Sequence, residues 1–352
     1  MSVSRSIENK VKYTLWNFLG PLFAAGRRKP ALPVNLQNIH SVLVIRPDRL
    51  GDVVLSTPVY PSIKKSMPEV RLTVLVDRVY MGILKDNPFI DEVIPLDREK
   101  PWRALRQLRK THFDLAFTLN KKFSATASLL NFFSRAALSV GYSHEESEWI
   151  HDIQVPVAPE PRHETQNNLE LLRAIGIEET SDAPQIHFND GESQRVDALI
   201  RDRRTHPERP LVLIKPGTRI GEWGWDLKNF QTVTELLLET ALAEVFIICG
   251  PDEETMSEFF LAPLKYKPVL LPVLPIKELA RAIQQADILF CNHTGIMHLA
   301  SAVQTPLLVI FKHGEIPRWG PVNTRSIVLE ELNNETLTPK SVIENIQHLI
   351  QS

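Results

Sequence analysis

The sequence has few cysteines, no long apolar run and no excess of either charge. Its two cysteines, Cys249 and Cys291, each close an apolar run and form no C-x-x-C pair. We therefore predict buried thiols in a reducing cytoplasm, and neither a disulfide scaffold nor a zinc site. No apolar stretch approaches the length of about 20 residues that spans a bilayer. The net charge of −2, from 40 basic and 42 acidic side chains, argues against nucleic-acid binding.

Two common motifs are also missing. No G-x-G-x-x-G follows a strand-like run, which argues against a nicotinamide-dependent oxidoreductase. No Asp-x-Asp motif is present to carry a divalent ion. We therefore expect neither a bound metal nor a cofactor.

The N-terminal 38 residues read as an amphipathic extension. Apolar side chains recur near helical spacing and a basic cluster, Arg27-Arg28-Lys29, follows them. Such a segment can lie in a membrane interface with its cations near anionic headgroups. It can equally dock on the surface of the protein itself, and the sequence leaves both readings open. The apolar positions are Ile7, Val11, Leu15, Phe18 and Leu22.

From residue 41 onward, short β-rich runs alternate with helical stretches, which predicts mostly parallel sheets covered on both faces. We expect an α/β fold with two Rossmann-like domains facing an interdomain cleft. The domains are an acceptor domain at 39–175, a nucleotide-sugar domain at 176–335 and a C-terminal helix at 336–352. The predicted strands are 41–46, 71–76, 113–119, 211–215, 245–249, 269–271, 288–291 and 307–311, and the predicted helices are 77–86, 101–110, 163–175, 227–240 and 276–285.

The tetrapeptide Arg49-Leu50-Gly51-Asp52 directly follows the first predicted strand. Active sites of open α/β sheets form beyond the carboxyl ends of the strands. Gly51 would let the backbone approach a ligand closely, and Asp52 would point its carboxylate into the cleft. Asp52 is also suited to capping a helix, and Ser56-Thr57-Pro58 offers a competing helix start.

A second candidate site follows the strand-like run at 288–291. The run Cys291 to Ala300 includes Thr294 as a candidate cap, Gly295 for close approach and His298 in the first turn. Backbone N–H groups and the dipole at a helix N-terminus favour phosphate. His298 alone is equally consistent with a structural histidine.

Residues 44–58 resemble the opening motif of glycosyltransferase family 9, the ADP-heptose:lipopolysaccharide heptosyltransferases. The resemblance covers residues 41–312 and implies two Rossmann-like domains of the GT-B type. It implies that Asp52 is the catalytic base, with Arg49 and Gly51 on the acceptor or phosphate side. The run 291–300 resembles the family signature Asp-Thr-Gly-x-x-His. The loops 215–219 and 250–254 also resemble loops of the family. Together, these three segments imply nucleotide-sugar contacts from Thr218, Arg219, Glu253, Asn292, His293, Thr294, Gly295 and His298.

Three positions bear on the choice of donor. His293 stands where the family usually has Asp, so a fixed anion is replaced by a group that is neutral or cationic near neutral pH. Glu222 precedes Trp223 where the family commonly has a lysine, and Lys228 or Arg219 would have to compensate. Glu253 resembles the acid that contacts the nucleoside, although Glu254 is close behind, and both acids could instead be solvated at a helix start.

The resemblance implies metal-independent, inverting transfer of heptose from ADP-heptose to the lipopolysaccharide core. The implied partners are a nucleotide sugar and a lipid A-linked acceptor, with peripheral association at the cytoplasmic face of the inner membrane. Two alternatives follow from His293 and the missing lysine: a transferase for another nucleotide sugar, and a non-catalytic paralogue that only binds one.

Overall fold

The computed structural model describes residues 30, 33–144, 149–218, 221–312, 314–331 and 337–351. The predicted amphipathic stretch at residues 7–29 lies outside them. The chain divides into two compact units, with the division between Asp182 and Ala183; we call them unit 1 and unit 2. Within the described ranges, no helix is both long and apolar enough to cross a bilayer.

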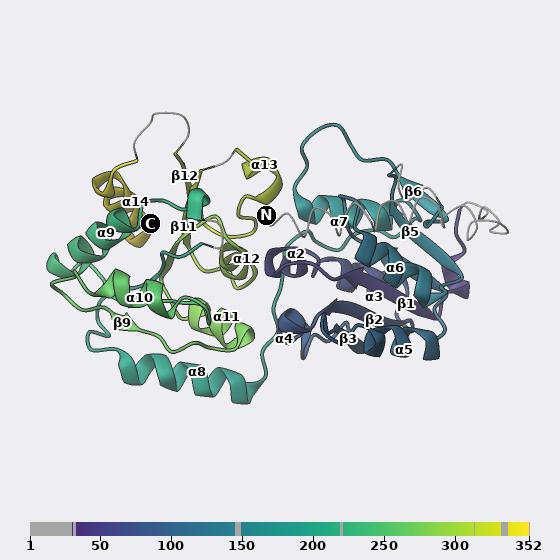
Figure 1. Ribbon diagram of the computed structural model, residues 1–352, viewed down its shortest axis with the longest axis horizontal. Coiled ribbons are helices and arrows are strands. Elements are labelled where there is room, and N and C mark those ends of the chain that lie inside the picture. Colours follow the sequence, from purple (N-terminus) through teal and green to yellow (C-terminus); the bar gives the residue numbers. More distant parts are fainter. Residues whose placement is uncertain are drawn as a thin grey trace. The chain divides into compact units, whose positions relative to one another are not determined.

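Unit 1 is built on a six-stranded sheet in which every neighbouring pair is parallel. The strand order is β3-β2-β1-β4-β5-β6, so β1 lies inside the sheet (Figure 1). Residues 42–45 of β1 are fully buried, as expected for a strand covered on both faces. The strands are β1 (Ser41–Arg46), β2 (Arg71–Asp77), β3 (Glu92–Leu96), β4 (Leu115–Thr118), β5 (Leu138–Tyr142) and β6 (Ile153–Val155).

The helices of unit 1 surround this sheet (Figure 1). Helices α5 and α6 pack on one face, where Leu108 and Leu130 join the same cluster as Leu43 and Ile45 of β1. Helix α7 contacts α2, α3 and β5. The helices are α2 (Leu50–Leu55), α3 (Val59–Ser66), α4 (Met81–Leu84), α5 (Trp102–Lys110), α6 (Ala125–Ser134) and α7 (Glu164–Arg173), and the 3-10 turns are η1 (Leu36–Asn38) and η2 (Arg78–Tyr80).

The helix predicted at residues 77–86 is shorter than expected. Asp77 does cap its start, because its carboxylate accepts a hydrogen bond from Val79 N at 3.1 Å. The chain then forms η2 and the four-residue α4, and Asp86 adopts a φ of 62°. A left-handed residue ends a helix, so the prediction extended too far.

Unit 2 repeats the architecture with a second parallel sheet, in the order β12-β11-β10-β7-β8-β9. Phe230 and Phe290 stack with ring centroids 4.6 Å apart in its core. The C-terminal helix α14 packs on α9. The strands are β7 (Leu211–Lys215), β8 (Glu244–Ile247), β9 (Val269–Leu270), β10 (Ile288–Asn292), β11 (Leu307–Phe311) and β12 (Ser326–Glu330). The helices are α8 (Asp190–Arg203), α9 (Leu227–Glu239), α10 (Glu254–Leu261), α11 (Ile276–Gln284), α12 (Gly295–Ala302), α13 (Ile316–Trp319) and α14 (Pro339–Gln351), with the 3-10 turn η4 (Gly221–Trp223).

The two cysteines differ in their surroundings. Cys291 lies within β10 and is fully buried, and burial raises the pKa of its thiol to about 12. Cys249 lies two residues beyond the end of β8 and is only half-buried. The prediction of a buried thiol is therefore confirmed for Cys291 and wrong for Cys249, because the strand ends before it.

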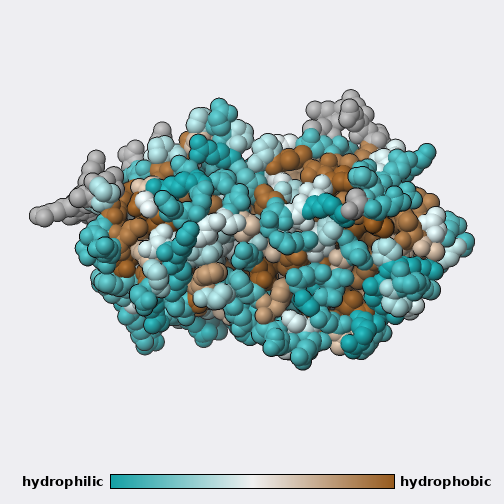
Figure 2. Space-filling view, turned by 180° about the vertical axis from the view of Figure 1, so that it is seen from behind, coloured by the Kyte–Doolittle hydropathy of each residue, from teal (hydrophilic) through white to brown (hydrophobic). Residues whose placement is uncertain are grey.

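The face of the molecule seen in Figure 2 is mainly hydrophilic, and hydrophobic residues show between the polar ones in separate patches. Scattered apolar surface of this kind is normal, since folded proteins lack enough polar surface to cover themselves.

Candidate active site

Asp52 lies in the first turn of α2, just beyond the carboxyl end of β1. Helix α2 begins at Leu50, so Arg49 and not Asp52 occupies the N-cap position. The Asp52 carboxylate accepts a hydrogen bond from Arg49 N at 3.4 Å, a length at which such a contact is weak. Its other oxygen, Oδ1, accepts a hydrogen bond from Arg46 Nη2 at 2.7 Å. Helix capping therefore accounts for only a minor part of the contacts of Asp52.

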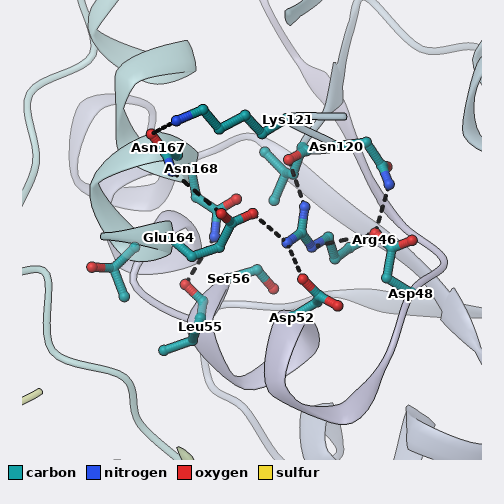
Figure 3. Close-up of polar contacts among 12 residues, drawn as sticks. Arg46, Asp48, Asp52, Leu55, Ser56, Asn120, Lys121, Glu164, Asn167 and Asn168 are labelled. Carbon is teal, nitrogen blue, oxygen red and sulfur yellow. Dashed lines mark hydrogen bonds and ion pairs between the residues drawn. The ribbon is translucent and has the colours of Figure 1, made fainter. Parts of the chain in front are cut away.

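The guanidinium of Arg46, the last residue of β1, lies at the centre of a cluster of acidic side chains (Figure 3). We call this cluster, Arg46 with Asp48, Asp52 and Glu164, the half-site of Asp52. Arg46 is 1% exposed, and its Nη2 donates to both Asp52 Oδ1 at 2.7 Å and Glu164 Oε1 at 2.9 Å. Its Nη1 donates to the backbone oxygen of Leu119 at 2.5 Å. A buried cation needs such partners, because an unpaired charge inside a protein is very costly.

Helix α7 supplies the second carboxylate and is itself tied to its neighbours (Figure 3). Glu164 stands in the first turn of α7 and is 1% exposed. Its Oε2 accepts a hydrogen bond from Asn167 Nδ2 at 3.3 Å. Asn168 Nδ2 donates to the backbone oxygen of Leu55 at 3.0 Å, which joins α7 to the end of α2. The carboxylates of Asp52 and Glu164 are thus held on one cation by two helices.

A third acid stands at the edge of the cluster. Asp48 Oδ2 lies 3.6 Å from Arg46 Nε and accepts a hydrogen bond from Asn120 Nδ2 at 2.7 Å. Burial disfavours the Arg46 cation, but the surrounding carboxylates outweigh burial and raise the pKa of Arg46. Burial raises the pKa of Asp52, Arg46 opposes this rise, and Asp48 and Glu164 add to it. A partly buried carboxyl with a raised pKa is suited to accepting a proton near neutral pH.

Sequence analysis missed both Arg46 and Glu164. Arg46 ends a strand of apolar residues, and a basic residue in that place also marks simply where a strand ends. A cation that closes a buried strand must find an anion, and that signal could have identified it. Glu164 lies 118 positions further along the chain, and no local pattern pairs two residues so far apart.

In unit 2, an ion pair joins the last residue of β7 to the loop that follows β8. Lys215 Nζ donates to Glu253 Oε1 at 2.7 Å and to Oε2 at 2.6 Å. Lys215 is 6% exposed. A Cβ on Gly217 would come within 2.5 Å of Glu253 Oε1 and 2.7 Å of Lys215 Nζ, so a side chain there would displace the ion pair from this position. Lys215 is a further residue that sequence analysis missed.

Asn292, the last residue of β10, is completely buried and fixes the loop after β7. Its Oδ1 accepts a hydrogen bond from Trp225 N at 2.9 Å, and its Nδ2 donates to the Pro216 oxygen at 2.8 Å. Within that loop, a Cβ on Gly224 would meet the methyl group of Thr218 at 2.6 Å. Asn292 and Thr218 are therefore brought together through this loop, in which Arg219 lies outside the described residues.

Thr294 is the N-cap residue of α12, yet its side chain does not cap the helix. Its Oγ1 is buried and makes no hydrogen bond with any described residue. Gly295 is the first residue of α12, and His298 follows in the first turn and is 3% exposed. The N–H groups at this end of the helix carry partial positive charge, which can bind an anion.

The remaining predicted residues have varied surroundings. The His293 ring stacks on Phe311 with centroids 4.1 Å apart and an interplanar angle of 16°. Arg49 is exposed, and Gly51 is buried within α2. Lys228 is exposed in the first turn of α9. Glu254 is the first residue of α10, and its side chain is outside the described part of the structure.

Comparison with known proteins identifies the family. The family model for glycosyltransferase family 9 (heptosyltransferase) matches residues 102–349. Lipopolysaccharide heptosyltransferase 3 of Escherichia coli is 24% identical over 293 residues, covering 79% of this chain and 85% of that protein. The glycosyltransferase family 9 structure from Veillonella parvula is 19% identical with a TM-score of 0.80, covering 89% of this chain and 98% of that one. The E. coli ADP-heptose lipopolysaccharide heptosyltransferase II structure is 20% identical with a TM-score of 0.74, covering 88% and 98%. These neighbours share the two-sheet GT-B fold, and the chain belongs to glycosyltransferase family 9.

Proposed function

We propose that this glycosyltransferase transfers a heptose from ADP-heptose to a sugar of the lipopolysaccharide core, with inversion at the anomeric carbon and without a metal ion. The donor and acceptor are those for which the relatives are named, an ADP-heptose lipopolysaccharide heptosyltransferase among them. The observation that carries the proposal is the carboxylate of Asp52, held at the carboxyl end of β1 by a buried arginine.

Asp52 is the proposed catalytic base. Its carboxylate accepts the proton of an acceptor hydroxyl while that oxygen bonds to the anomeric carbon of the donor. The bond between the anomeric carbon and the diphosphate oxygen breaks, and ADP leaves with the electron pair. Attack from the face opposite the leaving group inverts the configuration. A positioned base of this kind contributes about 10²- to 10⁴-fold in rate.

Unit 2 is the proposed donor-binding side. The N-terminus of α12 with the Thr294 hydroxyl, Gly295 and His298 would hold the diphosphate and stabilise the charge that develops on it. Thr218 and Glu253 would contact the nucleotide, and His293 would lie near the transferred sugar. Asn292 would act by positioning the loop that carries Thr218, because both ends of its amide are bonded to that loop.

The lysine missing at Glu222 has a candidate replacement in Lys215. Lys215 is a buried cation at the carboxyl end of β7, and Glu253 already neutralises it. By contrast, no ion pair within the described residues holds the exposed Lys228 in place. The exchange of Asp for His at 293 supports the alternative that the donor carries a different sugar.

A donor and acceptor panel tests the function. The pure protein is incubated with ADP-heptose and other nucleotide sugars and with truncated lipopolysaccharides, and products are detected by mass spectrometry and anomeric NMR. We expect a heptosylated product of inverted configuration from ADP-heptose, with chelator causing no loss. Product from another nucleotide sugar alone would favour the alternative donor, and tight ADP binding without any product would favour the non-catalytic paralogue.

A further inference from the structure

Three large apolar side chains of unit 1 are exposed on the segments that follow β2 and β3. Val79 of η2 is 71% exposed, Met81 of α4 is 38% exposed, and Trp102 of α5 is 58% exposed. The two strands are parallel neighbours, so the segments that follow them begin at the same edge of the sheet. Large apolar residues exposed on two neighbouring segments make this edge a candidate interaction surface.

Two ion pairs fix these segments to each other. Arg78 Nη1 lies 3.1 Å from Asp97 Oδ2, and Arg98 Nε lies 2.5 Å from Asp77 Oδ2. The first pair joins the segment after β2 to the segment after β3, and the second joins the last residue of β2 to the segment after β3. Arg98 Nη2 also donates to the Pro47 oxygen at 3.4 Å, so the apolar edge adjoins the loop between Arg46 and Asp52.

Helix α5 adds a cationic face to this edge. Its nine residues include four basic side chains, Arg103, Arg106, Arg109 and Lys110, all exposed, and no acidic one. Helical spacing places them on the same side as Trp102, opposite the buried Ala104 and Leu108. The Arg109 guanidinium lies 5.0 Å from the ring centroid of Phe133. No carboxylate of the described residues forms an ion pair with any of the four.

We propose that this surface, made of Val79, Met81, Trp102 and the four basic residues of α5, binds a bilayer that contains anionic phospholipid. The cations would meet the headgroup phosphates, and the three apolar side chains would enter the interface. Cations alone would suit any polyanion, but aliphatic Val79 and Met81 gain nothing from a soluble one. The net charge of −2 makes attraction to anionic lipid a property of this surface and not of the whole protein.

The proposal goes beyond sugar transfer, because membrane binding needs neither a donor nor a working base. The surface borders the half-site of Asp52, so binding would bring that half-site to a membrane-anchored acceptor. A D52N variant is therefore expected to bind vesicles as the unaltered protein does, whatever its effect on transfer.

Vesicle flotation with the full chain tests the surface. The vesicles are phosphatidylcholine alone or phosphatidylcholine mixed with phosphatidylglycerol, at low and high salt. We expect binding only to the mixed vesicles, weakened by salt. The triple variant R103Q/R106Q/K110Q should bind the mixed vesicles roughly 100-fold more weakly, because each cation contributes about five-fold to the affinity. The control R201Q/R203Q/K340Q removes the same charge from exposed residues of unit 2 and should bind normally.

The W102A variant separates a bilayer from a soluble polyanion. It should lose vesicle binding several-fold, because Trp102 no longer enters the interface. Circular dichroism confirms that each variant is folded. Three results would each overturn the proposal. The folded triple variant could bind vesicles as the unaltered protein does, the control variant could lose as much binding as the triple variant, or the unaltered protein could fail to bind at low salt.

Discussion

At the scale of single residues, one buried arginine sets the state of two carboxylates. Arg46 Nη2 is shared by Asp52 and Glu164, and these two acids come from different helices of unit 1. Arg46 therefore acts as a positioning residue that holds Asp52 in one orientation. It also limits the rise of the pKa of Asp52 that burial causes.

Substitutions of the two partners should shift the pH dependence of transfer in opposite directions. E164Q removes a negative charge that raises the pKa of Asp52, so the acidic limb of the kcat profile should move to lower pH. R46K keeps the positive charge, so the acidic limb should stay at nearly the same pH while kcat falls. R46M removes the cation, so the limb should move to higher pH. Shifts in the same direction for E164Q and R46M would contradict this assignment.

The R46M variant should also be less stable. It leaves the buried Glu164 and the partly buried Asp52 without their cation, and breaking a buried pair in this way costs about 3–5 kcal/mol. Urea unfolding at neutral pH measures the loss. A loss below about 1 kcal/mol would mean that water screens the cluster more than its burial indicates.

The sequence identified Asp52 through a motif but missed Arg46, Glu164 and Lys215. A motif reports residues that are close in sequence, whereas these three act through partners distant along the chain or on another loop. Lys215 and Arg46 each end a buried strand, and a polar residue there reads simply as the end of the strand. Their partners become visible only when the parallel sheet brings strand ends together.

At the scale of elements, α12 has a cap residue that does not cap. A Ser, Thr, Asp or Asn cap usually contributes about 1 kcal/mol through its side chain, but the Thr294 hydroxyl makes no such bond. T294V should therefore change the free energy of unfolding by much less. It should weaken ADP binding about 10-fold, because the hydroxyl is proposed to donate to a phosphate.

Denaturant unfolding and calorimetric titration with ADP measure the two effects separately. The control is T232V, on the exposed face of α9, which should leave ADP affinity unchanged. If T294V lost about 1 kcal/mol of stability and kept its affinity for ADP, the hydroxyl would serve only to cap the helix.

The elements that the sequence predicted best are the buried strands. β1, β7 and β11 have the predicted bounds, because a strand covered on both faces is a continuous apolar run. β3 contains Glu92 and Pro95 and lies at one edge of its sheet, and β12 is half-exposed at the edge of the other. Neither β3 nor β12 is a continuous apolar run, and for that reason both were missed.

At the scale of the whole molecule, the alternation of strands and helices predicted two α/β halves correctly. It did not predict the order of the strands, since order depends on pairing between residues far apart. The first strand of each sheet in chain order, β1 or β7, is an inner strand, and two later strands of the chain pair with it on either side. This arrangement creates the inner strand ends at which Arg46 and Lys215 lie.

Both units should lose stability in acid. In Asp91, Asp114 and Glu244, burial raises the carboxyl pKa, but hydrogen bonds outweigh it, so each pKa is lowered from 3.8 or 4.5. A lowered pKa gives stability that is present above the unfolded value and is lost as pH falls through the folded one. Asp52, with its raised pKa, contributes in the opposite direction but is a single group.

Urea unfolding as a function of pH measures this loss. The free energy of unfolding should fall as pH is lowered from about 5 to about 3. D114N should reduce the dependence, because Asp114 accepts hydrogen bonds from His40 N and Ser41 N at the start of β1. A stability that stays constant over this range, or an unaltered slope in D114N, would contradict the assignment.

The most direct test of the account is the turnover of D52N beside D48N. Both acids lie near Arg46, but only Asp52 accepts its hydrogen bond at 2.7 Å. With ADP-heptose and a truncated lipopolysaccharide acceptor, D52N should lose at least about 100-fold in kcat while its affinity for ADP stays unchanged. D48N should retain most of the rate. Near-full turnover by D52N would show that Asp52 is not the base.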